Sequence, residues 1–417
     1  MTRYDTVIVG AGHGGTQAAI TLRQQGFTGT IALVGAEASL PYERPPLSKE
    51  YLTGEKPFER LLIRLAEFWA EKDVTLMPGT RVVSVDPADR QITAADGTAI
   101  GYQHLIWAAG GTPRRLACEG ADLAGVHVLR TRADSDAILA DAGHARHVVI
   151  IGGGYIGLEA AASLRKLGKS VTVLEALPRV LARVAGDAIS TFFQDEHRRQ
   201  GVDIRLNARV ARLDGRDGRV SAVILEDGTT LPADLVIAGI GIVPETGPLT
   251  EAGAAGTNGV EVDAFCQTSL DGIYAIGDCA AFPCVWADGA IIRVESVQNA
   301  ADQAVTAARH IMGDSRPFDA LPWFWSNQYD LKLQTVGLSA GHDRTILRGD
   351  PSTRSFSVIY LKKGQVIALD CVNAAKDFAF GRKLVMEGVR AAEADLANTA
   401  IALNALLPVR EPVQAVR

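Results

Sequence analysis

Residues 4–15 read YDTVIVGAGHGG, and residues 147–159 read HVVIIGGGYIGLE. In both stretches a short apolar run rich in β-branched residues, typical of a buried parallel strand, leads into a glycine-rich turn. A segment with helical spacing follows each turn and ends at a glycine, Gly26 or Gly168, before a second apolar strand begins. A strand, glycine turn, helix and strand within about 30 residues form the pattern of a dinucleotide-binding βαβ segment. The sequence therefore predicts two such segments.

The glycines of each turn have separate tasks. Gly10 permits the tight turn, Gly12 lets a pyrophosphate approach the backbone, and Gly15 lets the helix pack closely on the strand. The second turn places glycines in the same three positions, at Gly152, Gly154 and Gly157. The free N–H groups at the start of each helix would then hold the phosphates of a dinucleotide.

An acidic residue at the end of the second strand would accept the hydroxyls of the adenosine ribose. In the second segment Glu175 holds this position, which favours NADH over NADPH because a carboxylate repels a 2′-phosphate. Arg179 and Arg183 follow, and they weaken this preference slightly because an arginine can bind a phosphate. In the first segment Ala36 holds the position, and the nearest carboxylate, Glu37, comes one residue later.

The composition is that of an ordinary globular protein, with 47% apolar and 22% charged residues among 417. The net charge of −6 lacks the basic footprint of a nucleic-acid-binding protein. No apolar run reaches roughly 18 residues, and the N-terminus has no signal-peptide pattern, so we expect no membrane span and no secretion. The five cysteines include no CxxC pair, which disfavours a disulfide scaffold and a zinc site and favours a reducing, cytoplasmic compartment.

The domain organisation follows from a repeat within the chain. Apolar strands with glycine exits at 105–114 and 233–243 each follow a probable hairpin, whose Asp-Gly turn lies at 96–97 or 227–228. We therefore predict three domains, made of residues 1–114 with 247–320, residues 115–246, and residues 321–417. Alternating apolar residues at 356–361 and 366–372, followed by helical spacing from about Lys376, predict strands and helices in the last domain.

Residues 268–280, TSLDGIYAIGDCA, predict a strand that ends at Gly277 and Asp278. A carboxylate there can accept a hydrogen bond from a sugar-alcohol hydroxyl, although an ordinary helix cap is the alternative. The helix expected from about Arg293 to Met312 would direct its free N–H groups at the carbonyl edge of a flavin ring. Two dinucleotide segments suit a nicotinamide and a flavin held face to face, in which the cofactors carry the chemistry.

The order of five motifs resembles the FAD- and NADH-dependent ferredoxin reductases that serve bacterial oxygenases, along almost the whole chain. These motifs are GAGHGG (10–15), PYERPPLSK (41–49), GGGYIGLE (152–159), TSLDGIYAIGDCA (268–280) and PWFWSNQYD (322–330). The resemblance implies an α/β fold with two Rossmann-like domains in a glutathione-reductase-like arrangement and a C-terminal α+β domain. It also implies FAD and NADH as cofactors and a [2Fe–2S] ferredoxin as a transient partner.

The resemblance also assigns roles to residues. Lys49 would lie beside the flavin N5 and pair with Glu159 where the nicotinamide arrives, Tyr155 would cover the flavin until NADH displaces it, and Trp325 would lie on the ferredoxin side. The positions that match FAD contacts are Gly10, Gly12, Gly14, Gly15, Ala36, Lys49, Val82, Arg130, Asp278 and Val297. The positions that match NADH contacts are Gly152, Gly154, Tyr155, Ile156, Gly157, Glu159, Glu175, Arg183 and Gly241. The family often has Asp where this chain has Ala36, which puts the ribose contact there in doubt.

The residue types alone leave other interpretations open. Lys49 could be a surface lysine at a helix start, Glu159 could simply favour the first helical turn, and Trp325 could be a core aromatic residue. The alternatives for function are a rubredoxin reductase, an oxygen-reducing NADH oxidase and a non-enzymatic redox-sensing flavoprotein. The oligomeric state is not predicted.

Cysteine separates this chain from related enzymes. Disulfide reductases of this architecture need a cysteine pair just after the first nucleotide segment, and persulfide reductases and peroxidases need one cysteine there. The first cysteine in this chain is Cys118, and residues 37–60 contain none. With no thiolate to take electrons from a flavin, we expect the electrons to leave the flavin directly, and no metal site is predicted.

Overall fold

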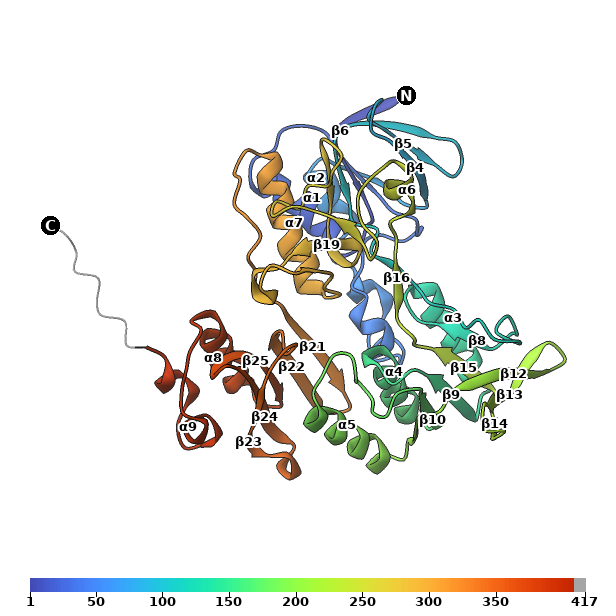
Figure 1. Cartoon of the computed structure of the whole chain (residues 1–417). Coiled ribbons are helices and arrows are strands. Elements are labelled where there is room, and N and C mark those ends of the chain that lie inside the picture. Colours follow the sequence, from blue (N-terminus) through green and yellow to red (C-terminus); the bar gives the residue numbers. More distant parts are fainter. Residues whose placement is uncertain (409–417) are drawn as a thin grey trace. The chain divides into compact units, whose positions relative to one another are not determined.

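The computed structural model describes residues 1–408, which form two compact units (Figure 1). The first unit comprises Met1–Pro178 and His197–Ala320, and the second comprises Arg179–Glu196 and the chain from Leu321 onward. Both glycine turns fall in the first unit, so the predicted boundaries near residues 114 and 246 stay predictions.

The first glycine turn connects two strands of a seven-stranded sheet. The chain passes from β1 (Thr2–Val9) through α1 (His13–Gln24) to β2 (Ile31–Val34), and the two strands pair in parallel, with Val9 opposite Val34. The strand order is β3-β2-β1-β6-β5-β4. Strand β18 pairs with residues 105–107 of β6, on the edge of β6 opposite β1. The remaining strands are β3 (Val74–Met77), β4 (Val82–Asp86), β5 (Gln91–Ala94), β6 (Ala99–Trp107) and β18 (Ile273–Ala275).

Helices cover this sheet because its strands are apolar on both faces. Helix α7 (Val297–Ile311) packs on α1, and alanines of both helices are buried with Ile8 and Leu33 in one core. The Asp96-Gly97 turn joins β5 to β6, as the sequence predicts. The smaller elements of this part are α2 (Ala66–Glu71), α6 (Gly247–Glu251), β17 (Val260–Glu261), β19 (Ala280–Pro283) and β20 (Ile291–Ile292).

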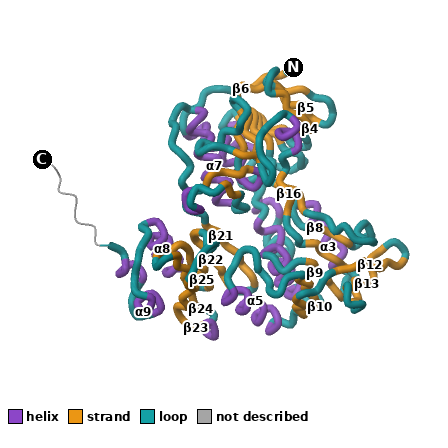
Figure 2. The backbone as a smooth tube through the Cα atoms, in the orientation of Figure 1, coloured by secondary structure: helices purple, strands orange, loops and turns teal. Residues whose placement is uncertain are grey.

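The second glycine turn repeats the arrangement in a five-stranded parallel sheet (Figure 2). Strand β9 (His147–Ile151) leads through α4 (Tyr155–Lys166) to β10 (Ser170–Glu175). The strand order is β11-β10-β9-β15-β8, with β8 (Val126–Val128), β11 (Asp203–Leu206), β15 (Leu235–Ala238) and the helix α3 (Arg132–Ala142). A separate antiparallel sheet contains β12 (Val210–Arg216), β13 (Arg219–Leu225) and β14 (Thr230–Pro232), with the predicted Asp227-Gly228 turn between the last two.

The chain passes between these two parts twice, and both crossings lie together. Strand β7 (Gly111–Pro113) carries the chain out, and β16 (Ile242–Pro244) brings it back. The two strands pair antiparallel, with Pro113 opposite Ile242. The two nucleotide segments are therefore joined by a two-stranded connection.

The second unit contains a five-stranded antiparallel sheet in the order β21-β22-β25-β24-β23. Its strands are β21 (Trp323–Gln328), β22 (Leu331–Gly337), β23 (Arg344–Asp350), β24 (Ser355–Lys362) and β25 (Gln365–Val372), and the helices α8 (Ala375–Met386) and α9 (Glu393–Ala397) follow. The strands predicted at 356–361 and 366–372 are therefore present. Helix α5 (Asp187–Arg199) also contributes to this unit, because the ring of Phe192 packs edge-on against Phe356 at 4.9 Å between centroids.

Candidate functional site

The first glycine turn keeps one position open above the backbone. Gly10 has a φ of 111°, and a Cβ there would lie 2.2 Å from the carbonyl oxygen of Ala108. A Cβ on Gly15 would lie 1.9 Å from the carbonyl oxygen of Gly10, so the fold itself requires both glycines. A Cβ on Gly12 would meet nothing closer than Arg44 Nε at 3.9 Å. The open space above Gly12, at the start of α1, is the cradle that a pyrophosphate requires.

The second turn has the same geometry. A Cβ on Gly152 would lie 2.3 Å from the carbonyl oxygen of Gly239. A Cβ on Gly157 would lie 2.1 Å from the carbonyl oxygen of Gly152. At Gly154 it would meet no atom within 4 Å. Gly12 and Gly154 are also the N-caps of α1 and α4, and neither helix start has a side-chain cap. Both turns thus fit a dinucleotide phosphate. Gly14, by contrast, is buried, and a Cβ on it would lie 3.5 Å from Ala300 Cβ on α7, an ordinary packing distance.

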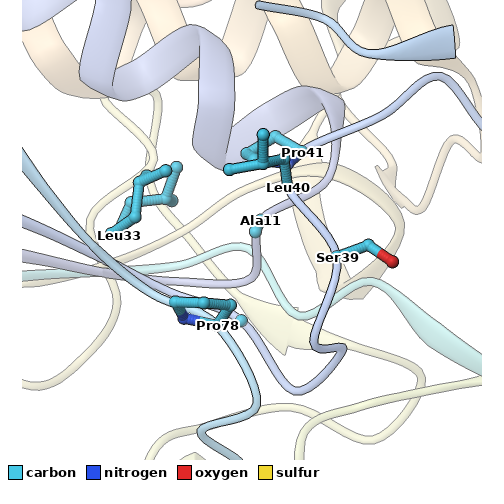
Figure 3. A pocket seen from close by; sticks show the side chains of 8 residues that line it. Ala11, Leu33, Ser39, Leu40, Pro41 and Pro78 are labelled. Atoms are coloured by element: carbon cyan, nitrogen blue, oxygen red, sulfur yellow. The ribbon is translucent and has the colours of Figure 1, made fainter. Parts of the chain in front are cut away.

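A hollow lies beside the first turn, at the carboxyl ends of β2 and β3 (Figure 3). Its empty volume is about 210 Å³, including the part that opens to solvent. The crevice outside the carboxyl ends of the strands is where doubly wound sheets bind nucleotides. Ala36 is exposed directly after β2, and Val82 is buried in β4. The lining residues are Ala11, Leu33, Gly35, Ser39, Leu40, Pro41, Leu76 and Pro78.

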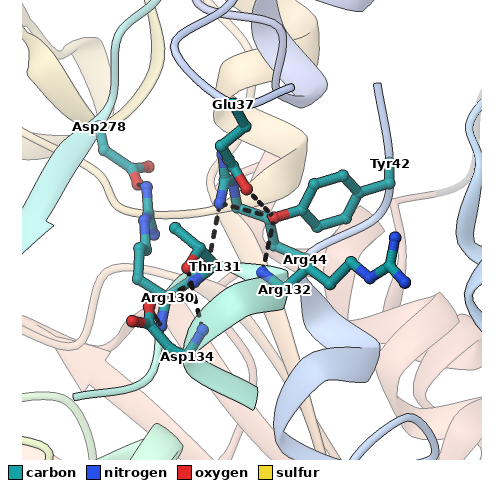
Figure 4. Close-up of polar contacts among 8 residues, drawn as sticks. All are labelled: Glu37, Tyr42, Arg44, Arg130, Thr131, Arg132, Asp134 and Asp278. Carbon is teal, nitrogen blue, oxygen red and sulfur yellow. Dashed lines mark hydrogen bonds and ion pairs between the residues drawn. The ribbon is translucent and has the colours of Figure 1, made fainter. Parts of the chain in front are cut away.

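Glu37, the carboxylate nearest to the predicted ribose position, is held by neighbouring side chains (Figure 4). Arg44 Nη2 lies 2.6 Å from its Oε1, and the hydroxyl of Tyr42 donates to its Oε2 at 2.6 Å. The backbone N–H of Arg132 donates in turn to the Tyr42 hydroxyl, and burial raises the pKa of that phenol. Each oxygen of Glu37 therefore already accepts a hydrogen bond from the protein.

Arg130 and Asp278, two residues matched to FAD contacts, meet in an ion pair (Figure 4). Arg130 Nη2 lies 2.9 Å from Asp278 Oδ2, and Arg44 Nη1 donates to the Arg130 carbonyl at 2.9 Å. A capping box between Thr131 and Asp134 starts α3 directly after Arg130 and fixes this corner of the chain. Burial, and next the charge of Arg44, lower the pKa of His13 to about 4. The imidazole of His13 is therefore neutral at pH 7, and the positive charges in this corner are the guanidinium groups of Arg44 and Arg130, each paired with a carboxylate.

Val297 is the first residue of α7 and is half-buried. The helix start is fixed by Ser296, whose side chain accepts a hydrogen bond from the backbone N–H of Asn299 at 3.0 Å. Helix α7 thus begins at Val297 and not near Arg293 as predicted, because the extended residue Ser296 is its N-cap. Its approach to a flavin stays a prediction.

Lys49 and Glu159 form a buried ion pair across the two nucleotide segments. Lys49 follows the short 3-10 helix η1 (Pro45–Ser48), and its Nζ lies 2.5 Å from Oε2 of Glu159 on α4. The Glu159 side chain is 2% exposed and that of Lys49 is 12% exposed, so water screens the pair weakly. The structure therefore brings together the two residues matched to catalysis, while their catalytic role stays a prediction.

Ser48 also contacts this ion pair, and its sequence position alone did not indicate the contact. Its hydroxyl donates to the same Oε2 of Glu159 at 2.6 Å, and the residue is 2% exposed. The available signal was its position directly before Lys49, in a segment whose two prolines restrict the backbone.

The start of α4 also carries Tyr155 and Ile156, of which Tyr155 is half-buried and Ile156 is exposed. Close to them, Glu175 folds back onto the second glycine turn. Its Oε2 accepts from the backbone N–H of Gly153, and its Oε1 accepts from that of Leu177, both at 2.8 Å. The carboxylate is thus fixed beside the turn, where a ribose of a dinucleotide on that turn would lie. Gly241, with a φ of 95°, lies just beyond the end of β15.

The remaining assigned residues, Arg183 and Trp325, lie in the second unit. Arg183 is exposed, and Trp325 lies in β21 with its ring 5.5 Å from that of Trp323. Their roles stay predictions. Arg179 is held within its own segment, because it donates to the Ala185 carbonyl and to Ser190 Oγ, both at 2.7 Å.

All five cysteines are free thiols, and four of them are buried. Burial raises the pKa of Cys279 to about 11 and that of Cys371 to about 12, so thiolates are disfavoured. Cys279 donates to the Ile276 carbonyl at 3.3 Å and forms no bond with Cys284. Within residues 1–408, no group of three or more His, Cys, Asp or Glu side chains is arranged to hold a metal ion. Over the same residues, every helix is too short or too polar to cross a bilayer.

Comparison with known proteins agrees with this geometry. Residues 4–304 match the family described as "Pyridine nucleotide-disulphide oxidoreductase", and residues 323–407 match the one described as "Reductase C-terminal". A 5,5'-dehydrodivanillate O-demethylase ferredoxin reductase subunit from Sphingobium sp. is 56% identical over 97% of this chain and 99% of that protein. A ferredoxin–NAD(P)(+) reductase from Sphingomonas sp. is 59% identical over 92% of this chain and 93% of that protein.

A solved structure shows the same fold. In the crystal structure of the covalent putidaredoxin reductase–putidaredoxin complex, the matching chain is 38% identical with a TM-score of 0.93. The match covers 97% of this chain and 98% of that chain. The α/β fold with two Rossmann-like parts and a C-terminal α+β part is therefore confirmed. The chain belongs to the pyridine nucleotide-disulphide oxidoreductase family and, within it, to the ferredoxin reductases of oxygenase systems.

Proposed function

We propose that the protein transfers electrons from NADH, through bound FAD, to a [2Fe–2S] ferredoxin that serves an oxygenase. The single observation that carries this proposal is the buried Lys49–Glu159 pair, which connects the segment of the first glycine turn to the helix of the second. A protein that bound two unrelated nucleotides would have no need for a charge pair between them. We further propose that it acts in the cytoplasm, where NADH is supplied.

Several residues are arranged to bind the two cofactors. Gly12, Arg44 and Arg130 offer open backbone and positive charge to the pyrophosphate of FAD, and Asp278 offers a carboxylate to its ribityl chain. Gly154 and Glu175 offer the equivalent open turn and ribose acceptor to NADH. When bound, FAD accepts a hydride from NADH and gives up its two electrons singly, which is chemistry of the cofactor and not of a side chain.

Lys49 and Glu159 would act on the charge and position of the reacting rings. Their opposite charges lie 2.5 Å apart in a place that water hardly reaches, so a small change in ring charge is felt strongly there. The buried thiols have raised pKa values and offer no relay, which supports direct transfer from the flavin to the partner.

Anaerobic stopped-flow spectroscopy with two successive mixings tests the proposal. NADH should first bleach the flavin absorbance, and a [2Fe–2S] ferredoxin added next should restore it while the iron–sulfur absorbance falls. A flavin that NADH does not reduce would contradict the proposal. So would a reduced flavin that leaves the ferredoxin oxidised but gives its electrons rapidly to a rubredoxin or, in air, to oxygen.

A further inference from the structure

The hydroxyl of Ser48 links the two members of the buried ion pair. It donates to Glu159 Oε2 at 2.6 Å, and Lys49 Nζ lies 3.4 Å from Ser48 Oγ as well as 2.5 Å from the same carboxylate oxygen. One carboxylate oxygen thus receives both an ammonium and a hydroxyl. A second acceptor for the hydroxyl, the Pro45 carbonyl, is distant at 3.4 Å, so the carboxylate is the main partner.

The backbone around Ser48 is held by other residues. Ser163, one helical turn after Glu159 on α4, donates its hydroxyl to the Ser48 carbonyl at 2.7 Å. Ser135 on α3 donates to the Leu47 carbonyl at 3.0 Å. Both serines are buried, and their hydroxyls hold the main chain of the segment by hydrogen bonds. Anchoring of the segment is therefore separate from the bond that the Ser48 hydroxyl makes to the carboxylate.

A lysine needs such support more than a shorter side chain does. Its ammonium is a point charge on a flexible stem, so its position depends on the position of the carboxylate with which it pairs. Glu159 also has several rotatable bonds, and each hydrogen bond that its carboxylate accepts limits them. The Ser48 hydroxyl, on a short side chain with one rotatable bond to the oxygen, donates to the carboxylate and limits this freedom.

We propose that Ser48 is a positioning residue, whose hydroxyl fixes the Glu159 carboxylate and thereby the Lys49 ammonium for the approach of the nicotinamide. This inference rests on the proposed roles of Lys49 and Glu159. Ser48 itself supplies no proton and contacts no reacting atom.

The test compares Ser48→Ala with Ser163→Ala and Ser135→Ala, all in the FAD-loaded protein. Loss of a hydrogen bond to a charged group should lower the limiting rate of flavin reduction by NADH about tenfold in Ser48→Ala. The two control variants, which lose a bond to the backbone of the same segment, should stay within about twofold of the original protein. Ser48→Thr, which keeps the hydroxyl, should restore the rate, and Ser48→Cys, which keeps the volume but donates weakly, should not.

A second readout does not depend on activity. In oxidised protein labelled with ¹³C at the glutamate carboxyl carbon and without NADH, Glu159→Gln identifies the Glu159 signal. That signal should change position in Ser48→Ala and stay in place in Ser163→Ala. An unmoved signal, or equal loss of rate in Ser48→Ala and in the two controls, would overturn the inference and leave only a role in anchoring.

The failure of the inference can be distinguished from failure of the proposed roles. If Glu159→Gln and Lys49→Met reduce the rate strongly but Ser48→Ala does not, the positioning role alone is wrong. If Glu159→Gln leaves the rate unchanged, the proposed role of the ion pair is wrong, and the positioning inference is overturned with it.

Discussion

Two glutamates lie at or just after the ends of the second strands of the two βαβ segments, and their surroundings differ. Glu37 is held by the side chains of Arg44 and Tyr42. Glu175 accepts instead from the backbone N–H of Gly153, inside the second glycine turn. Glu175 therefore lies where the ribose of a dinucleotide on its own turn would meet a carboxylate.

Replacing Glu175 by alanine tests its role as the ribose acceptor. A hydrogen bond to a charged group is worth roughly 1.5–3 kcal/mol, so kcat/KM for NADH should fall at least about tenfold. NADPH should lose much less, because its 2′-phosphate does not benefit from the carboxylate. Steady-state kinetics with both coenzymes measures the ratio. Glu37→Ala is the matched control and should leave the ratio unchanged, and an unchanged ratio in Glu175→Ala would remove the assignment.

For single residues, the sequence predicts roles that depend on local spacing. It does not predict hydrogen bonds between residues that are far apart in the chain. The three required positions of each glycine turn follow from spacing, and the structure has them. The bonds of Glu37 do not follow, because they depend on a tyrosine and an arginine brought back by the loop that follows β2. The contact of Ser48 with Glu159 spans 111 residues of sequence, and no local rule reaches that far.

The second glycine turn gives a matched pair of variants at the scale of an element. Gly154→Ala should fold normally, since its Cβ meets no atom within 4 Å and its φ is −79°. It should weaken NADH binding about tenfold or more, because the methyl group occupies the space of the pyrophosphate.

Gly157→Ala should behave in the opposite way. Its Cβ would collide with the carbonyl oxygen of Gly152 at 2.1 Å, so the protein should lose stability by about 1–3 kcal/mol. Thermal denaturation and equilibrium NADH binding separate the two effects. Equal losses of stability in the two variants would contradict the distinction between an open and a filled position.

The antiparallel pair β24–β25 carries a buried acid with a measurable pH dependence. Asp370 on β25 accepts from the Tyr360 hydroxyl at 2.6 Å, and burial raises the pKa of its carboxyl from 3.8 to about 7. Below the unfolded pKa both states are protonated, and the group contributes nothing. As the pH rises from there to about 7, the unfolded chain ionises while the folded chain stays protonated, so the free energy of unfolding falls.

Asp370→Asn should remove this loss. Urea denaturation at about pH 5 and about pH 8 should show a decline in the original protein that is larger than in the variant, by up to roughly 3 kcal/mol. Asp343→Asn, at an exposed position beside the same sheet, is the control. Equal pH dependence of the original protein and Asp370→Asn would show that the carboxyl is ionised in the folded state.

Elements were predicted well where one periodicity dominates. The apolar run HVVII before the second glycine turn forms a strand over its whole length, His147–Ile151, as its β-branched residues favour. Both long helices of the glycine turns begin a few residues earlier than their apolar spacing suggests, at His13 and Tyr155, because the open glycine is itself the N-cap.

At the scale of the whole molecule, electrons should need no sulfur on their way from the flavin to the ferredoxin. Replacing Cys118, Cys266, Cys279, Cys284 and Cys371 one at a time by alanine should leave ferredoxin reduction within about twofold, once stability losses from small cavities are allowed for. Cytochrome c reduction coupled to the ferredoxin measures this rate. Loss of ferredoxin reduction with flavin reduction intact in one variant would identify a thiol relay and contradict direct transfer.

The grouping of residues 179–196 with the C-terminal sheet was not predicted. It depends on contacts between distant segments: Phe192 packs on Phe356, and Arg354 Nη2 lies 3.0 Å from Oε1 of the buried Glu196. The hydroxyl of Tyr360 also accepts from the backbone N–H of Gly186 at 3.2 Å. Each residue type fits a local helix or strand equally well, so only the folded chain reveals the association.

The antiparallel pairing of β7 and β16 has a consequence for the ancestry and engineering of the chain. Pro113 and Ile242 are register partners, so their Cα atoms are separated by only about 5 Å. A loop of one or two residues could close that gap without altering the order of strands β1, β6 and β18, although a segment exchanged between 114 and 241 must keep the packing of residues 179–196 on the C-terminal sheet. The chain therefore has the form expected if an ancestral gene acquired its second nucleotide site by insertion into a surface turn.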